Sequence, residues 1–179
     1  MLQITIPEVE RYDEINNTFI ITKEQTVQLE HSLVSLSKWE SKWCKPFLNK
    51  DTKTMEETID YIRCMTISQN INPEIYLSLT TDNLKQVKDY IDAPMTATTF
   101  YEEKKAGGRE VITSELLYYW LIALSIPFEC QKWHLNRLIT LIKICNIKNT
   151  PPEKMSKQSI LSRNAALNNA RKKKMHTNG

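Results

Sequence analysis

The chain has 179 residues, of which 41% are hydrophobic and 25% charged, a balance typical of one domain with an appendage. It contains only three glycines, so the Gly-rich loops that bind nucleotide phosphates are not expected. From Thr150 onward there are seven basic residues and one acid, a charge of +6. Because the whole chain is +3, the part before Thr150 carries −3. A basic tail of this kind favours an anionic surface or an acidic protein as its partner.

The N-terminal residues do not have the basic and apolar regions of a signal peptide. The longest apolar stretch, Leu116 to Phe128, is shorter than the about 20 residues that span a bilayer. The four cysteines are far apart and form no Cys-x-x-Cys pair: Cys44, Cys64, Cys130 and Cys145. We therefore expect a chain made in the cytosol, with reduced thiols and no membrane partner.

Residues 1–34 are predicted to form short antiparallel strands. Hydrophobic and polar residues alternate three times, at Leu2, Ile4 and Ile6, at Phe19 and Ile21, and at Val27, Leu29 and Leu33. This period indicates an antiparallel β-meander with one buried face. His31 shares that face, and we interpret it as a hydrogen-bonded or edge histidine rather than a metal ligand.

Residues 37–93 have helical spacing. Ser37 is the expected cap of a short helix whose Trp39 and Trp43 share one face, as core residues or, alternatively, as a base-stacking platform. Three further helical segments are expected to begin at the capping box Thr54-Met55-Glu56-Glu57, at Asn72-Pro73, and at Thr80 or Thr81. The segment Met95 to Phe100 is predicted to be extended or an added strand, and Glu102 to Arg109 a flexible loop.

Residues 113–147 are predicted to form a helical hairpin. Thr113 or Ser114 caps a first helix that is apolar nearly all round, so we expect other elements to enclose it. After Ile126-Pro127, a second, amphipathic helix is expected from about Phe128 to Ile147. The predicted fold is therefore α+β: a β-meander and a mainly helical body over 1–149, a linker over 150–156, and a basic helix and tail over 157–179, with Ser156 as the cap of the last helix.

Neither a metal site nor a catalytic site is expected. Cys130 and His134 lie one helical turn apart, but Cys145 is roughly 22 Å further along a helix and cannot reach the same ion. The acidic residues Glu56, Glu57 and Asp60 are expected on the polar face of a helix, where its dipole explains them. No familiar nucleophile motif is present. The sequence therefore predicts a protein that is not an enzyme and needs no cofactor.

Two binding hypotheses remain open. The C-terminal helix carries little apolar surface and many cations, so we predict that it binds a partner protein or a neighbouring copy through Ile160, Leu161, Arg163, Leu167, Arg171, Lys172, Lys173 and Lys174. The alternative is a nucleic-acid-binding module in which the second hairpin helix enters a groove, using Lys132, Asn136, Arg137 and Lys143, while the basic tail contacts phosphates.

Three stretches carry a resemblance to known proteins. They are Ser37 to Trp43, Ile112 to Trp120 followed by Ile126 to Leu138, and Pro151 to Ser156 with Ser162 to Asn168, and they resemble a family of small tailed-bacteriophage proteins. The resemblance implies a virion or tail-assembly protein, such as a tail assembly chaperone, whose partners are other phage tail or virion proteins. It places the protein in the host cytoplasm or the virion, and it carries over no catalytic or binding residue.

Overall fold

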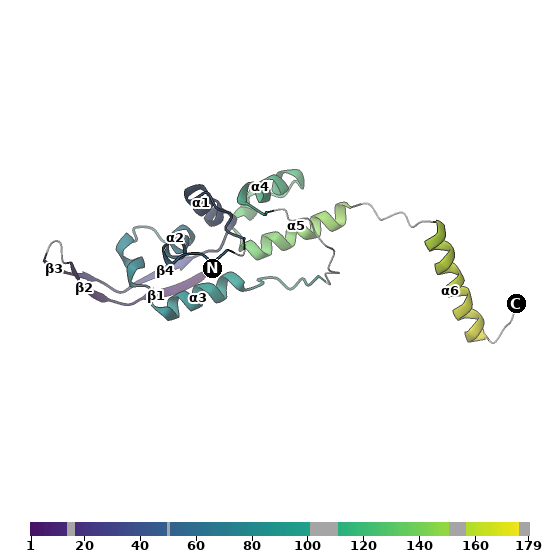
Figure 1. Ribbon diagram of the computed structural model, residues 1–179, viewed down its shortest axis with the longest axis horizontal. Helices are drawn as coiled ribbons and strands as arrows, with labels where there is room; N and C mark the ends of the chain where they lie inside the picture. The colour runs from purple at the N-terminus through teal and green to yellow at the C-terminus, as the bar shows by residue number, and fades with distance from the viewer. Residues whose placement is uncertain (14–16, 50, 101–110, 151–156, 176–179) are drawn as a thin grey trace. The chain divides into compact units, whose positions relative to one another are not determined.

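The computed structural model describes residues 1–13, 17–49, 51–100, 111–150 and 157–175, and the chain divides into two units, Met1–Asn146 and Ile147–Gly179. The division falls inside a helix, close to the boundary predicted at residue 149. In chain order the elements are β1 (Leu2–Ile6), β2 (Val9–Asp13), β3 (Thr18–Thr22), β4 (Gln25–Leu29), α1 (Leu33–Trp43), α2 (Met55–Met65), η1 (Pro73–Ser78), α3 (Thr81–Asp92), α4 (Ser114–Ala123), η2 (Phe128–Lys132), α5 (Leu135–Asn149) and α6 (Lys157–Met175) (Figure 1). Strands and helices together confirm the α+β class.

The strands form a nested ribbon rather than a meander. A meander pairs each strand with the next, whereas here β1 pairs antiparallel with β4 and β2 with β3, in two separate ladders. The chain runs out along β1 and β2, turns, and returns along β3 and β4, so only the inner pair is consecutive. Alternating hydrophobicity fixes which face a residue occupies but not which strand lies beside it.

Only half of this ribbon has the predicted buried face. In the β1·β4 ladder, Ile4, Ile6, Val27 and Leu29 are fully buried under the helices. In the β2·β3 ladder, the expected core residues Phe19 and Ile21 are 66% and 59% exposed, together with Tyr12. Figure 1 shows β2 and β3 at one end of the first unit, beyond its helices, and this position leaves their apolar side chains uncovered.

Helices α1 and α2 pack on each other, and α3 packs on β1. The predicted cap Ser37 lies inside α1, which begins one turn earlier because Ser32 accepts a hydrogen bond from the backbone N–H of Ser35 in a capping box. Trp39 is buried and its indole N–H donates to the carbonyl of Glu57 at 2.9 Å, so the core interpretation of this tryptophan is confirmed.

The caps predicted at Thr54, Asn72 and Thr80 are all present, and each accepts a backbone N–H two or three residues later. The described segment before residue 101 contains no strand after Leu29, so of the two alternatives predicted for Met95 to Phe100, an extended segment or an added strand, the added strand is absent. The predicted loop from Glu102 to Arg109, most of the predicted linker and the cap Ser156 lie outside the described residues.

The two hairpin helices are both present, but the second begins later than predicted. Phe128–Lys132 forms the 3-10 turn η2, and α5 starts only at Leu135. Between them Trp133 is extended, and His134 forms a β-bridge with Ser32, since the N–H of Leu135 donates to the carbonyl of His31 at 2.7 Å. Helix α4 packs mainly on α1, so the body is organised around α1 more than around an α4·α5 pair.

Candidate interaction surfaces

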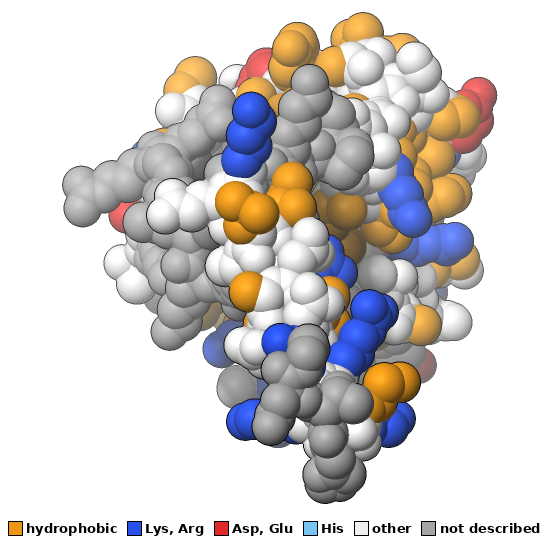
Figure 2. Space-filling view, turned by 90° about the vertical axis from the view of Figure 1, so that its right-hand side faces the viewer, with side chains coloured by type: hydrophobic (Ala, Val, Ile, Leu, Met, Phe, Trp, Pro, Cys, Tyr) orange, Lys and Arg blue, Asp and Glu red, His pale blue; other side chains and the backbone are white. Residues whose placement is uncertain are grey.

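Helix α4 lies at the surface and is not enclosed, contrary to the prediction. It buries only Ser114, Leu117 and Leu121, while Tyr119 and Ile122 are 61% and 64% exposed. Residues three apart share one face of a helix, so these two side chains form an apolar outer face of α4. Figure 2 shows hydrophobic side chains exposed in the upper part of the face that it displays.

A buried carboxylate fixes which face of α4 points outward. Glu40, on α1, is 7% exposed, and its Oε2 accepts the backbone N–H of Ser114 at 2.7 Å. Its Oε1 accepts the N–H of Phe47 at 2.8 Å. An anionic acceptor at the first turn of a helix satisfies a free N–H and complements the helix dipole. Glu40 therefore ties α4 to α1 and directs Leu117 and Leu121 inward.

The sequence offers no local signal for this outer face. Nearly every residue from Leu116 to Leu124 is apolar, so periodicity does not separate the inner side from the outer one. The outcome depends on Glu40, which lies 74 residues before its partner Ser114.

Helix α6 presents all the predicted partner-binding residues to solvent. Ile160 and Leu167 are 43% and 47% exposed, Leu161 is 69% exposed, and the cations Arg163, Arg171, Lys172, Lys173 and Lys174 are exposed. The 19 residues of α6 contain six basic residues and no acid. A helix with so little apolar burial is marginal by itself in water, so it gains stability when a partner covers it.

The residues of the nucleic-acid alternative do not form one free polar face. The Asn136 side-chain amide donates to the carbonyls of Ile91 and Ala93, at 2.9 and 2.8 Å, and so caps the C-terminal end of α3. Arg137 lies over the ring of Trp133, 4.2 Å from its centroid. Lys143, on α5, has its ammonium 5.7 Å from the ring centroid of Phe100. Lys132 belongs to η2.

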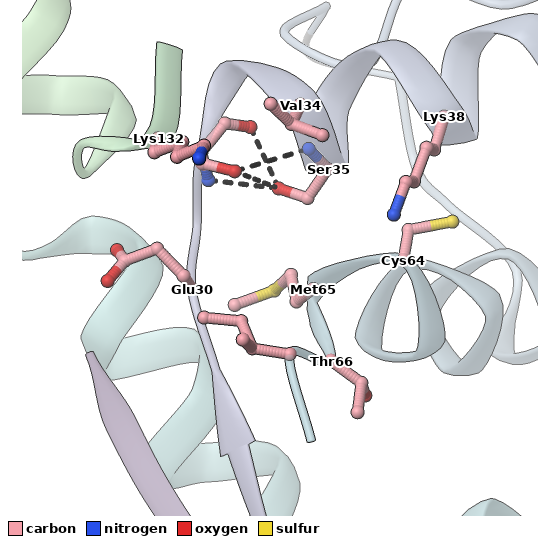
Figure 3. A pocket seen from close by; sticks show the side chains of 10 residues that line it. Glu30, Val34, Ser35, Lys38, Cys64, Met65, Thr66 and Lys132 are labelled. Atoms are coloured by element: carbon pink, nitrogen blue, oxygen red, sulfur yellow. Dashed lines mark hydrogen bonds between the residues drawn. The ribbon is translucent and has the colours of Figure 1, made fainter. Parts of the chain in front are cut away.

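A cleft of about 380 Å³ lies between the start of α1 and the end of α2 (Figure 3). Glu30, Lys38, Cys64 and Lys132 line it together with apolar side chains. Figure 3 shows the Lys38 ammonium near the Cys64 sulfur. Burial, with Asp60 nearby, nevertheless raises the pKa of the Cys64 thiol, which disfavours the reactive thiolate. The Ser32 and Ser35 hydroxyls take part in the hydrogen bonds of the α1 capping box.

The acidic residues at the start of α2 have structural partners. Glu57 and Asp60 are buried rather than on a polar face, which corrects the prediction. The Lys45 ammonium donates to Glu57 and, with the N–H of Thr54, lowers the pKa of Glu57. Burial alone would raise the pKa of Asp60, but hydrogen bonds from Lys42 and the Trp43 indole outweigh it and lower that pKa. These contacts join α1 to α2.

His31 and His134 form a buried pair between β4, α2, α3 and α5. Their ring centroids are 5.1 Å apart, and His31 Nδ1 lies 2.6 Å from the Tyr61 hydroxyl. His134 Nδ1 accepts the N–H of Asn136, so its Nε2 carries the hydrogen and donates to the carbonyl of Tyr90 at 3.0 Å. Burial and the neighbouring His134 lower the pKa of His31 to about 3. His31 is thus a hydrogen-bonded residue of the core, which confirms the first of the two predicted alternatives, a satisfied histidine, over an edge position.

Among the described residues, no three His, Cys, Asp or Glu side chains lie close enough to hold a metal ion. The same part of the chain contains no helix with the length and apolarity needed to cross a bilayer. Comparison with known protein families, curated proteins and solved structures gives no match for this chain.

Proposed function

We propose that this chain is an assembly protein that acts by binding other proteins and catalyses no reaction. The observation that carries the proposal is the apolar outer face of α4, Tyr119 and Ile122, exposed on a well-packed body. Covering two large side chains that are more than half exposed is worth roughly 2–4 kcal/mol. Aromatic residues are enriched in the centres of protein interfaces, so Tyr119 fits such a contact.

The class of partner follows from the resemblance to small tailed-bacteriophage proteins. Its second stretch begins with Ile112 to Trp120, which covers α4 from its start at Ser114 through Trp120 and includes Tyr119. We therefore infer that the partner is another phage tail or virion protein and that the chain serves tail assembly, either in the host cytoplasm or as a minor component of the virion.

Helix α6 is proposed as the element that recruits this partner. Its cations increase the rate of encounter with an acidic surface, and Ile160 and Leu167 add apolar contact once the helix has docked. In this proposal α6 provides long-range attraction, and α4 provides the apolar contact.

A pull-down of tail and virion proteins from phage-infected cells tests both elements. We expect capture by the full chain to fall at least tenfold with Ile122→Asp and with a chain that ends at Asn149. Ile67→Asp is the matched control, because Ile67 is also an exposed isoleucine, 52% accessible, on a different surface. If capture is unchanged in the Ile122→Asp variant, α4 is not the binding surface, and unchanged capture by the truncated chain rejects the role of α6.

Nucleic-acid binding is the second candidate, and the charge of α6 favours it. Six cations without an acid in Lys157–Met175 should bind any polyanion with a strong dependence on salt. A mobility-shift assay at two salt concentrations distinguishes the candidates, with a variant in which Lys172, Lys173 and Lys174 are replaced by Gln as the comparison. Absence of a shift at low salt rules this function out.

A further inference from the structure

The β2·β3 ladder differs from the β1·β4 ladder in how its edges are covered. A third segment pairs beside β4, since the N–H of Ile67 donates to the carbonyl of Gln28 at 2.9 Å. At the outer edge of β1, the side-chain amide of Asn83 donates a hydrogen bond to the carbonyl of Thr5 at 3.1 Å. In the described part of the chain no strand pairs with the outer edge of β2 or β3.

One face of the β2·β3 ladder carries three large apolar side chains that are open to solvent. Tyr12 lies directly opposite Phe19, and Ile21 lies opposite Glu10, so these four residues share a face. The Tyr12 and Phe19 rings are 5.0 Å apart, and Tyr12, Phe19 and Ile21 are between 51% and 66% exposed. A two-stranded ribbon without a covering layer is marginally stable in water, so this one gains stability from an additional strand.

We propose that β3 of one copy pairs antiparallel with β3 of a second copy, joining the two ribbons into one four-stranded sheet. The inference is independent of the α4 surface and goes beyond the partner binding proposed above. A strand edge offers a row of backbone donors and acceptors, and antiparallel pairing of identical strands satisfies both copies by two-fold symmetry.

The distribution of charge selects β3 as the pairing edge. The sequence of β2 contains Glu10, Arg11 and Asp13, and charges on an edge strand oppose edge-to-edge pairing. The sequence of β3, Thr18-Phe19-Ile20-Ile21-Thr22, contains no charge and consists of residues that favour strands.

The sequence of β3 also suits antiparallel pairing with an identical β3 strand. With the two-fold axis at Ile20, Thr18 faces Thr22 of the second copy, and Phe19 faces its Ile21. Because directly opposed residues share a face of the sheet, the exposed faces of the two ribbons become continuous. Tyr12, Phe19 and Ile21 of each copy then line one apolar surface across the four strands.

The available area predicts a weak dimer. Edge-to-edge pairing covers only part of the roughly 300 Å² per copy that the three exposed side chains offer, because the face they form stays open to solvent. A stable interface of standard size buries about 800 Å² per partner, so we expect a dissociation constant between about 1 μM and 1 mM. Association of this strength forms and dissolves with protein concentration.

Sedimentation velocity of the full chain from about 5 μM to about 1 mM tests the proposal. We expect a concentration-dependent dimer that Ile21→Lys converts to monomer throughout this range. Ile67→Lys and Ile122→Lys are matched controls, because they add the same charge at isoleucines that are 52% and 64% exposed elsewhere. A monomer at every concentration overturns the proposal, as does a dimer that survives Ile21→Lys or is abolished by Ile122→Lys.

The register is tested with cysteines in a Cys44→Ser background, since Cys44 is the exposed native thiol. Mixing Phe19→Cys with Ile21→Cys should give a disulfide between the two chains on mild oxidation, because opposed residues have Cα atoms about 4.5–5.5 Å apart. Each variant alone should cross-link much less. Equal cross-linking of the single variants, or none in the mixture, contradicts the pairing even if Ile21→Lys impairs folding of the ribbon.

Discussion

The buried histidine pair should make the stability of the first unit depend on pH. An unfolded histidine titrates near pH 6.5, whereas His31 in the fold has a pKa of about 3. The unfolded chain therefore binds a proton that the folded chain excludes, and stability falls as the pH decreases from 6.5 towards 3. At about pH 5 the cost from His31 alone is about 2 kcal/mol relative to about pH 7.5.

His134 acts in the same direction. Burial lowers its pKa, and this effect is only partly opposed by the carbonyl of Tyr90 and the carboxylate of Glu30. A proton on its Nδ1 would also displace the N–H of Asn136, which that nitrogen accepts. Glu57 and Asp60 have lowered pKa values, so their stabilising contribution is lost only below about pH 4, outside the histidine window.

Urea unfolding at about pH 7.5 and about pH 5, followed by circular dichroism, measures the effect. We expect the wild type to lose at least about 2 kcal/mol between the two, and His31→Leu to lose clearly less, whatever its stability at neutral pH. Tyr61→Phe is the control: it removes the 2.6 Å hydrogen bond at a cost of about 1 kcal/mol and should still lose stability on acidification. Equal stability of the wild type at both pH values, or an unchanged pH response in His31→Leu, would refute this reasoning.

Alanine substitutions at three further positions test contacts that position the surfaces. For each variant, the quantity measured is the free energy of unfolding in urea. Glu40→Ala should cost about 2–4 kcal/mol because it leaves the N–H groups of Phe47 and Ser114 buried without an acceptor, and Glu40→Gln, which keeps one acceptor, should cost less. Thr54→Ala should cost about 1 kcal/mol through loss of the α2 cap, with Thr54→Ser nearly neutral. Asn136→Ala should cost about 1–2 kcal/mol because two carbonyls at the end of α3 lose their donor. A change below 0.3 kcal/mol in the alanine variants would show that these hydrogen bonds are replaced by water.

Local features of the fold were predictable from the sequence because their causes are local. The caps at Thr54 and Thr80 depend on a side chain and a backbone N–H three residues later, so the sequence contains both partners of the contact. The start of α1 was misplaced because Ser32, Ser35 and Ser37 all occur within one turn and a half. Ser32 has the extended backbone of an N-cap and forms a β-bridge with His134, a partner that is distant in sequence.

Features that join distant parts of the chain were not predictable. The alternation of hydrophobic and polar residues identified the faces of the strands but not the pairing of β1 with β4. It also assigned Phe19 and Ile21 to the core, although both side chains are exposed. The outward face of α4 depends on Glu40, and the late start of α5 depends on the bridge between Ser32 and His134. In each case the deciding partner lies far away in sequence, and one sequence without structural information gives no indication of it.

The nesting of the strands has a consequence for how fast the first unit folds. β1 and β4 are joined through 18 intervening residues, between Ile6 and Gln25, so a disordered chain must close a long loop before they meet. If the β2·β3 hairpin forms first, on a time scale of about 1–10 μs, it brings Ile6 and Gln25 close together. The β1·β4 ladder can then form from that end, one residue pair after another. The hairpin turns near Asn17, a residue that tolerates its positive φ of 53°. A ribbon that contributes little to the core would thus act as the folding nucleus of the sheet, and changes in it would slow folding more than they accelerate unfolding.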